Sequence, residues 1–284
     1  MIMMVMKMIK CIASDLDGTL LYKGLLSDSN KKAIQMIQEK GIEFIIATGR
    51  DFSQTKHLFD EFGFSCDSIL LNGTCFINSK LEVEFTIGLE KESVRQACEL
   101  VLNKGLGIMF YTKDKVVCFK NKALVCEDFS AALFEYSKDI VTYEFYEAIE
   151  EYHDLDEMMA QGPLSCEIMS RNGELVEEVK EELKKIEGID VTSSIPKEIE
   201  FTSIHASKGK ALQKVCELKG YKQDEVVVFG DGGNDISLFE CFDRAYAMGN
   251  ADPVIKKVAK HTCLNCEEDG FYHKVMELLE EDNG

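Results

Sequence analysis

Two aspartates near the start of the chain, Asp15 and Asp17, follow the apolar run in IKCIASDLDGTLLYKG. Removing a carboxylate from water costs free energy unless a partner offsets it, so two acids after a buried strand need an explanation. On an extended segment, side chains two residues apart point the same way, about 6.5 Å apart along the strand. The pair therefore predicts one site with two tasks, in which one carboxylate attacks as a nucleophile and the other exchanges a proton.

Polar residues also stand where other predicted strands end and where one predicted helix begins. In an open parallel sheet, ligands bind beyond the carboxyl ends of the strands. Carboxylates crowded at that edge are tolerated around a hard cation, and Mg²⁺ prefers oxygen ligands in octahedral geometry. The sequence therefore predicts a magnesium site at this edge. The further candidate residues are Thr48, Gly49, Arg50, Asn72, Lys208, Asp231, Asn234 and Asp235.

The parts of the chain that must position these residues are short apolar runs, which alternate along the sequence with amphipathic segments. This alternation is typical of parallel strands joined by crossover helices. The predicted strands cover 9–15, 42–50, 68–73, 225–231 and 244–250, and the predicted helices cover 27–41, 51–63, 206–220, 233–242 and 252–260. We therefore expect an α/β fold whose core is a doubly wound parallel sheet.

The character of the chain changes near residue 83 and changes back after residue 196. Between these points, a strongly charged helical pattern over 173–188 and an alternating stretch over 107–120 predict an α+β region with antiparallel strands. The alternating stretch is typical of a hairpin that turns at 113–115, and the helix charges predict a face in contact with water. The expected domains are residues 1–82 as the first part of the core, 83–196 as an inserted α+β cap, and 197–284 as the second part of the core.

Length and charge narrow the class of protein. With 284 residues the chain is long enough for two domains, and its formal net charge is −19. Such a charge argues against nucleic acid or an anionic membrane as a partner, because both reward a basic surface. No run reaches the roughly 18 apolar residues that a membrane-spanning helix needs. The start is rich in methionine, which raises a separate hypothesis that translation begins at Met8.

The chain contains 11 cysteines at irregular spacing. Cys263 and Cys266 form a C-x-x-C pair, but no second pair stands at the spacing of a zinc site. This usage indicates free thiols in the reducing cytoplasm.

Four segments, DLDGTLL, ATGR, SKGKAL and GDGGND, resemble in this order the four motifs of the haloacid dehalogenase superfamily of phosphatases. The position of the insert after the third predicted strand resembles the Cof-type subgroup with its α+β cap, and so does the tail AMGNADPVIKKVAKHTCLNCEEDG. The resemblance spans nearly the whole chain, although the cap matches in layout rather than in motif. It implies a Rossmann-like core and a Mg²⁺-dependent phosphatase.

The resemblance also implies a role for each candidate. Asp15 would be the nucleophile that takes the phosphoryl group, and Asp17 would protonate the leaving alcohol and later activate water. Mg²⁺ would be held by the carboxylates of Asp15 and Asp231 and by the backbone carbonyl of Asp17. Asp235 would order a metal-bound water or Lys208. The phosphate-binding residues would be Thr48, Gly49, Lys208 and Asn234.

For some of the candidate residues the sequence allows two interpretations. Arg50 either pairs with a carboxylate or contacts the substrate, and Asn72 lies either in a substrate loop or in a β-turn. Taken singly, Asp15 and Asp17 also fit a capped turn, and GDGGND fits a glycine turn that caps a helix. The joint placement of all these motifs at one sheet edge favours the catalytic interpretation.

The sequence thus predicts a phosphatase that hydrolyses small phosphorylated metabolites, such as sugar phosphates, through an aspartyl-phosphate. A cap over the site leaves little room for a protein substrate, and flavin or pyridoxal phosphates also fit. The alternative is a phosphotransferase or phosphomutase on the same scaffold, because the cap chooses the acceptor. The prediction leaves the oligomeric state open.

Three other classes fit less well. A signalling receiver domain would be shorter and would lack the Asp-x-Asp spacing. An inactive binding module would not retain every charged motif residue. A nucleotide-binding ATPase would need a phosphate loop, and ASKGKAL lacks its G-x-x-x-x-G-K-[ST] pattern.

Overall fold

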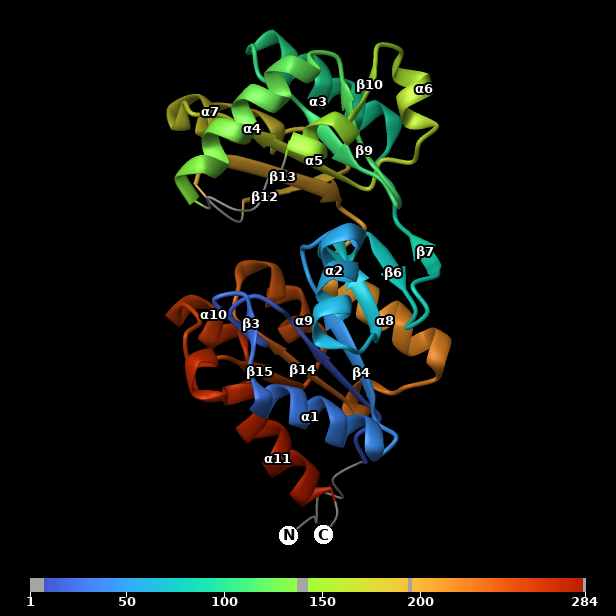
Figure 1. The fold of residues 1–284 in the computed structure, drawn as a ribbon, viewed down its shortest axis with the longest axis vertical. Helices are drawn as coiled ribbons and strands as arrows, with labels where there is room; N and C mark the ends of the chain where they lie inside the picture. Colours follow the sequence, from blue (N-terminus) through green and yellow to red (C-terminus); the bar gives the residue numbers. More distant parts are fainter. Residues whose placement is uncertain (1–7, 137–142, 194–195, 283–284) are drawn as a thin grey trace. The chain divides into compact units, whose positions relative to one another are not determined.

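The computed structural model describes residues 8–136, 143–193 and 196–282 (Figure 1). The chain forms two compact units. The first combines the residues up to Arg50 with Gln54–Phe85 and the residues from Ser207 onward, and the second combines Asp51–Ser53 with Thr86–Ala206. Residues 1–7, on which the hypothesis of a start at Met8 depends, lie outside the described residues. Within the described ranges, no helix is both long and apolar enough to cross a membrane.

An eight-stranded sheet forms the middle of the first unit, in the order β16-β15-β14-β1-β4-β5-β6-β7. All five neighbouring pairs from β16 to β5 are parallel, as the α/β prediction requires. The next strand, β6, runs antiparallel to β5, unlike the parallel core that was predicted. Only the short 3-10 helix η1 (Leu71–Gly73) and its flanks join these two strands, and a parallel connection needs a dozen or more residues. The strands are β1 (Cys11–Ser14), β4 (Glu43–Ala47), β5 (Asp67–Leu70), β6 (Cys75–Ile77), β7 (Val83–Thr86), β14 (Val226–Gly230), β15 (Arg244–Ala247) and β16 (His261–Thr262).

Helices cover both faces of this sheet, because its central strands bury side chains on both sides. In β1, Ile12 joins one apolar cluster while Cys11 and Ala13 join the other. The helices on the Ile12 side are α1 (Asp28–Glu39), α2 (Phe52–Phe62) and α11 (Gly270–Glu281). Those on the opposite side are α8 (Lys208–Lys219), α9 (Ile236–Cys241) and α10 (Pro253–Val258). This is the doubly wound arrangement, with one layer of helices on each face of the sheet (Figure 1), and in such sheets ligands bind at the carboxyl ends of the strands.

Every helix and strand predicted for the core is present, with ends that differ by a few residues. Several short elements escaped prediction because runs of two to four residues carry little periodicity. The twelve-residue helix α11 was also not predicted. The elements of this unit that were not predicted are β2 (Leu21–Tyr22), β3 (Leu25–Leu26), β6, β7, β16, α11, η1, η2 (Gln223–Glu225), η3 (Gly233–Asp235) and η4 (Cys266–Glu268).

The second unit contains a six-stranded sheet in the order β10-β9-β8-β11-β13-β12. Four of its five neighbouring pairs are antiparallel, and only β9 and β10 run parallel. Its strands are β8 (Met109–Tyr111), β9 (Val116–Phe119), β10 (Glu150–Tyr152), β11 (Ser165–Met169), β12 (Ile189–Thr192) and β13 (Glu198–Ser203). Its helices are α3 (Lys91–Asn103), α4 (Lys122–Tyr136), α5 (Tyr143–Ala148), α6 (Leu155–Met159) and α7 (Gly173–Leu183).

Two predictions made from the sequence concern this unit, a hairpin near residue 114 and the end of the insert at residue 196. The predicted hairpin is confirmed, since β8 and β9 pair antiparallel and the amide of Thr112 donates to the carbonyl oxygen of Lys115 at 2.9 Å. The expected end of the insert at residue 196 differs from the end of the compact unit at Ala206. The reason is β13, which pairs with both β11 and β12 and therefore lies with the second unit.

A group of acidic side chains lies on the sheet of the second unit. Glu167 of β11 stands opposite Glu200 of β13 in the strand register, and its Oε2 accepts a hydrogen bond from the hydroxyl of Tyr111 at 2.5 Å. Burial raises the pKa of Glu167 well above the usual glutamate range, and the carboxylates of Glu198 and Glu200 raise it further. The hydrogen bond from Tyr111 lowers this pKa but does not outweigh the other effects.

We expect Glu167→Gln to flatten the pH dependence of stability. The folded state keeps a proton on Glu167 that an unfolded glutamate releases near its ordinary pKa of about 4.3, so the unfolded chain binds fewer protons and stability falls as pH rises above that value. Glutamine does not titrate. The measurement is the urea midpoint between about pH 5 and about pH 8, with the exposed Glu177→Gln of α7 as control. Equal pH slopes for Glu167→Gln and the wild type would contradict this account.

Candidate active site

Asp15 and Asp231 follow two neighbouring strands of the sheet. β1 and β14 are parallel and pair Ser14 with Phe229, and the amide of Asp15 extends this pairing by donating to the carbonyl oxygen of Phe229 at 3.0 Å. Asp15 is buried, with 6 % of its surface exposed, whereas Asp231 is half-buried. Both carboxylates therefore stand at the carboxyl edge, where open α/β sheets bind ligands.

Lys208 reaches the same place from the first turn of α8. Its Nζ donates to Oδ1 of Asp15 at 2.6 Å and to Oδ1 of Asp235 at 2.7 Å. The side chains of Lys208 and Asp235 are fully buried. One ammonium group thus bridges two carboxylates that come from different strand ends.

Two glycines fix the start of α8. A Cβ at Gly73 would lie 2.3 Å from the carbonyl group of Ser207, and Gly73 has a φ of +107°, which favours glycine. A Cβ at Gly209 would lie 2.0 Å from the carbonyl oxygen of Ser237, so α8 meets the start of α9 with no side chain between them. These close approaches determine the point from which Lys208 extends.

Asp235 uses both of its carboxylate oxygens within the protein. Oδ1 accepts from Lys208, and Oδ2 accepts from the amides of Asp231 and Gly232 at 2.9 Å each. A Cβ at Gly230 would lie 2.5 Å from Cγ of Asp235, so this carboxylate packs directly against the Gly230 backbone. Asp235 therefore orients Lys208 and the backbone of the turn.

The ammonium group of Lys208 lies among three carboxylates, and the pKa values of Asp15 and Asp231 reflect the crowding. The pKa of Asp15 is raised to about 8, because burial and the Asp235 carboxylate raise it more than Lys208 lowers it. The pKa of Asp231 is raised to about 6, because burial raises it more than a hydrogen bond from Thr19 lowers it. Burial alone would lower the pKa of Lys208, but Asp15 and Asp235 outweigh it and raise that pKa above the usual lysine range. The site has a surplus of negative charge that a cation would offset.

The donor atoms fit a hard divalent cation. Oxygen atoms of Asp15, Asp231 and Asp235 lie within 4.8 Å of one another. Asp235 accepts three hydrogen bonds, whereas Asp231 accepts two, one on each oxygen, and Oδ1 of Asp15 accepts one from Lys208, so Asp15 and Asp231 are better suited to bind a metal. Carboxylate oxygen is the ligand type that Mg²⁺ prefers, and a cation would favour the ionised forms that burial disfavours.

Asp17 has a different partner from Asp15. β1 ends at Ser14 and a turn follows, so the extended segment through Asp17 that the sequence predicted is wrong. Arg50 donates to the Asp17 carboxylate at two points, from Nε to Oδ2 at 2.8 Å and from Nη2 to Oδ1 at 2.7 Å. Of the two interpretations of Arg50, the structure therefore shows the one in which Arg50 pairs with a carboxylate, that of Asp17. The side chain of Asp17 is 54 % exposed, so this pair is open to solvent.

The remaining candidates join the end of β4 to the turns after β5 and β14. The hydroxyl of buried Thr48 accepts from the amide of Arg50, and its carbonyl oxygen accepts from the amide of Asn72, both at 3.1 Å. Oδ1 of Asn72 accepts from Nδ2 of Asn234 at 2.9 Å. A Cβ at Gly49 would lie 3.2 Å from Oδ1 of Asn72. The four candidates thus lie together. The role of Thr48, Gly49 and Asn234 in binding phosphate, and that of Asn72 in contacting the substrate, stay predictions.

Two polar side chains that the sequence analysis did not single out contact Asp231. The hydroxyl of Thr19 donates to Oδ1 at 2.9 Å, and Nδ2 of Asn250 donates to Oδ2 at 3.1 Å. Both residues lie in segments that resemble the family, DLDGTLL and AMGNADPVIKKVAKHTCLNCEEDG. Neither carries a charge, so only their place beside these motifs offered a signal.

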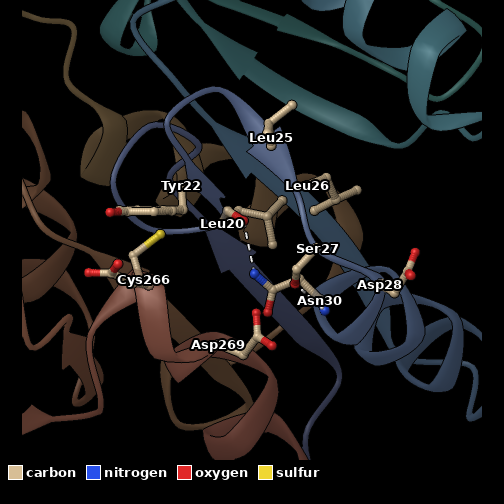
Figure 2. Close-up of a pocket in the computed structure, with 10 residues that line it drawn as sticks. Leu20, Tyr22, Leu25, Leu26, Ser27, Asp28, Asn30, Cys266 and Asp269 are labelled. Atoms are coloured by element: carbon tan, nitrogen blue, oxygen red, sulfur yellow. Dashed lines mark hydrogen bonds between the residues drawn. The ribbon is translucent and has the colours of Figure 1, made fainter.

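A cavity of about 400 Å³ lies beside the hairpin of β2 and β3 (Figure 2). Asn30 on its wall donates to the carbonyl oxygen of Leu20 at 2.9 Å and accepts from the amide of Tyr272 at 3.1 Å, so its amide joins the hairpin to α1 and α11. None of the predicted site residues is among the described residues that line it. The lining residues are Leu20, Tyr22, Leu25, Leu26, Ser27, Asp28, Asn30, Cys266, Glu267 and Asp269.

Comparison with known proteins confirms the resemblance found in the sequence. Residues 12–275 match the model of a family described as haloacid dehalogenase-like hydrolase. A 5-amino-6-(5-phospho-D-ribitylamino)uracil phosphatase of Bacillus subtilis is 28% identical over 263 residues, which cover 92% of each chain. A solved haloacid dehalogenase-like hydrolase from Bacteroides thetaiotaomicron is 27% identical, with a TM-score of 0.77 over 95% of this chain and 99% of its own. A sugar phosphatase of haloacid dehalogenase subclass IIB shares the fold at 23% identity, with a TM-score of 0.73 over 95% of this chain and 98% of its own.

Replacing Lys208 should destabilise the protein strongly. Lys208→Met leaves Asp15 and Asp235 buried without their cation, which costs about 3–5 kcal/mol in the free energy of unfolding. The loss should grow as pH rises, because the buried carboxyl of Asp15 must then ionise without its cation. Urea unfolding measures it, with Lys210→Met on the exposed face of the same helix as a control expected within about 0.5 kcal/mol of wild type. Equal free energies for the two variants would show that the buried bridge does not stabilise the fold.

Proposed function

The chain belongs to the Cof-type haloacid dehalogenase-like hydrolases and is a phosphoric monoester hydrolase, and we propose that it works through Mg²⁺ and an aspartyl-phosphate on Asp15. The observation that carries the proposal is the buried bridge of Lys208 to Asp15 and Asp235. The side chain of Lys208 is fully buried, so it makes no contact with solvent. Its ammonium group lies next to Asp15, where it could offset the negative charge of a phosphoryl group on that residue.

In the first step, Asp15 attacks phosphorus. A bond forms between a carboxylate oxygen of Asp15 and phosphorus while the bond from phosphorus to the ester oxygen breaks. Asp17 gives a proton to the departing alcohol. Lys208 offsets the charge of the phosphoryl oxygens, and the predicted phosphate contacts of Thr48 and Asn234 orient the group.

In the second step, Asp17 takes a proton from water, and the water oxygen attacks phosphorus. The bond between phosphorus and Asp15 breaks, so inorganic phosphate leaves and the Asp15 carboxylate is restored. Before either step, Asp17 must exchange the two N–H donors of Arg50 for the substrate or water.

The metal would be held by the carboxylates of Asp15 and Asp231 and by the backbone carbonyl of Asp17. When bound, Mg²⁺ supplies positive charge to the phosphoryl oxygens and lowers the repulsion between them and Asp15. Asp235 would hold Lys208 in place, which matches its hydrogen bonds from Lys208 and from two backbone amides.

Small phosphorylated metabolites are the substrate class that we propose, with sugar and polyol monophosphates first. The relative from Bacillus subtilis is named for a phosphorylated ribityl compound, and one structural relative is described as a sugar phosphatase. The net charge of −19 disfavours nucleic acid as a substrate. None of the cysteines, all of which lie within the described residues, forms a disulfide, which suits a reducing cytoplasm as the place of action.

Phosphate release from a panel of phosphorylated metabolites tests the proposal. We expect release with Mg²⁺, none with EDTA, and a loss of at least about 10³-fold in Asp15→Asn, which keeps the shape of the side chain but removes the nucleophile. Asp60→Asn, an exposed change on α2, should behave as wild type. Normal release by Asp15→Asn would exclude the mechanism. Consumption of the ester without release of phosphate to water would favour the phosphotransferase or phosphomutase alternative.

A further inference from the structure

Asn250 makes three hydrogen bonds although its side chain is exposed. Its Nδ2 donates to the carbonyl oxygen of Gly18 at 2.8 Å and to Oδ2 of Asp231 at 3.1 Å. Its Oδ1 accepts from the amide of Cys266 at 2.8 Å. The orientation of the amide is therefore determined, because the oxygen end must face an N–H donor and the nitrogen end must face two acceptors.

Backbone hydrogen bonds of the two residues before Asn250 fix the point from which its side chain extends. The amide of Met248 donates to the carbonyl oxygen of Gly230 at 2.9 Å, and the amide of Gly249 donates to the carbonyl oxygen of Leu264 at 3.0 Å. A Cβ at Gly249 would lie 2.4 Å from Oδ1 of Asn265, so this backbone packs directly against the neighbouring loop. The side chain of Asn250 thus starts from a fixed point despite its exposure.

Asp231 receives one side-chain hydrogen bond on each carboxylate oxygen. Thr19 donates to Oδ1 and Asn250 donates to Oδ2. A Cβ at Gly18 would lie 2.3 Å from Oδ2, so the Asp231 carboxylate packs against the backbone of the turn that follows Asp15. Two donors and this contact define the plane of the carboxylate, while each oxygen keeps a second lone pair for a cation.

Asn250 also connects two segments that are far apart in the chain. The carbonyl oxygen of Gly18 belongs to the turn that carries Asp17, and Asp231 follows β14. The proposed metal ligands come from both segments. A single amide that bonds both of them fixes the separation between the Asp17 carbonyl and the Asp231 carboxylate.

From these contacts we infer that Asn250 is a positioning residue for the metal site, and that it raises the affinity for Mg²⁺ by orienting Asp231 toward the turn of Asp17. The inference rests on the proposed function, because it needs Mg²⁺ to bind at Asp15 and Asp231. Asn250 does not contact the reacting atoms. Loss of a group that orients a metal ligand typically weakens metal binding about 10- to 100-fold.

The test is the dissociation constant of Mg²⁺, measured by titration calorimetry on the full chain without substrate. We expect Asn250→Ala to raise it about tenfold. At saturating Mg²⁺ the rate of phosphate release should return to within about threefold of wild type, because the catalytic groups are intact. Unfolding in EDTA reports whether the variant is folded, and Asn250→Ser offers a second variant that keeps a polar side chain too short to reach Asp231.

Asn265→Ala is the matched control. Asn265 is an exposed asparagine that lies against Gly249, in the loop that holds Asn250. If the loop mattered only for folding, both changes would alter stability and neither would alter the Mg²⁺ constant of the folded protein. We expect Asn265→Ala to bind Mg²⁺ as the wild type does.

The outcomes separate this inference from the proposed function. Wild-type protein that binds no Mg²⁺ would overturn the proposed metal site and the inference with it. Wild-type protein that binds Mg²⁺, together with a folded Asn250→Ala of unchanged affinity, would overturn the inference alone. Failure of both Asn250 variants to fold in EDTA and in Mg²⁺ would assign the residue a purely structural role and would also overturn it.

Discussion

The buried bridge from Lys208 to Asp15 and Asp235 is the constraint on which the site depends. Burying charges is costly, and one ammonium group cannot balance these two carboxylates together with Asp231. The raised pKa values of Asp15 and Asp231 record that imbalance. A protein selected only for stability would place apolar side chains here, so the arrangement is best explained by a ligand that brings the missing positive charge and then a phosphoryl group.

The residues of this bridge meet because the fold makes neighbours of segments that are far apart in the chain, and no single motif contains them all. Parallel pairing of β1 with β14 sets Asp15 beside the turn of Asp231, and the glycine contacts of α8 bring Lys208 to both. The turn after β14 then locks Asp235 with two backbone amides. A Cβ at Gly73, Gly209 or Gly230 would collide with its neighbours, which explains why glycines lie close to the acids.

The sequence was sufficient for the parts that follow from strand-end geometry, such as the α/β core and the meeting of Asp15, Lys208 and Asp231. It could not decide between the two interpretations of Arg50, because a contact between chain-distant side chains depends on rotamers and on where a strand ends. The same reason hid Asn250, an uncharged residue whose partners lie on three other segments. The antiparallel β6 was missed because three residues show no useful periodicity.

The claim that Asp15 carries the phosphoryl group is tested most directly by trapping it. The Asp17→Asn variant with p-nitrophenyl phosphate suits this purpose, because that leaving group needs no proton and the variant is slow to activate water. Borohydride reduces an aspartyl-phosphate to homoserine, which peptide mass spectrometry detects at a single position. We predict substrate-dependent conversion of Asp15 alone. Turnover without conversion at Asp15, or conversion of a different aspartate, would contradict the account.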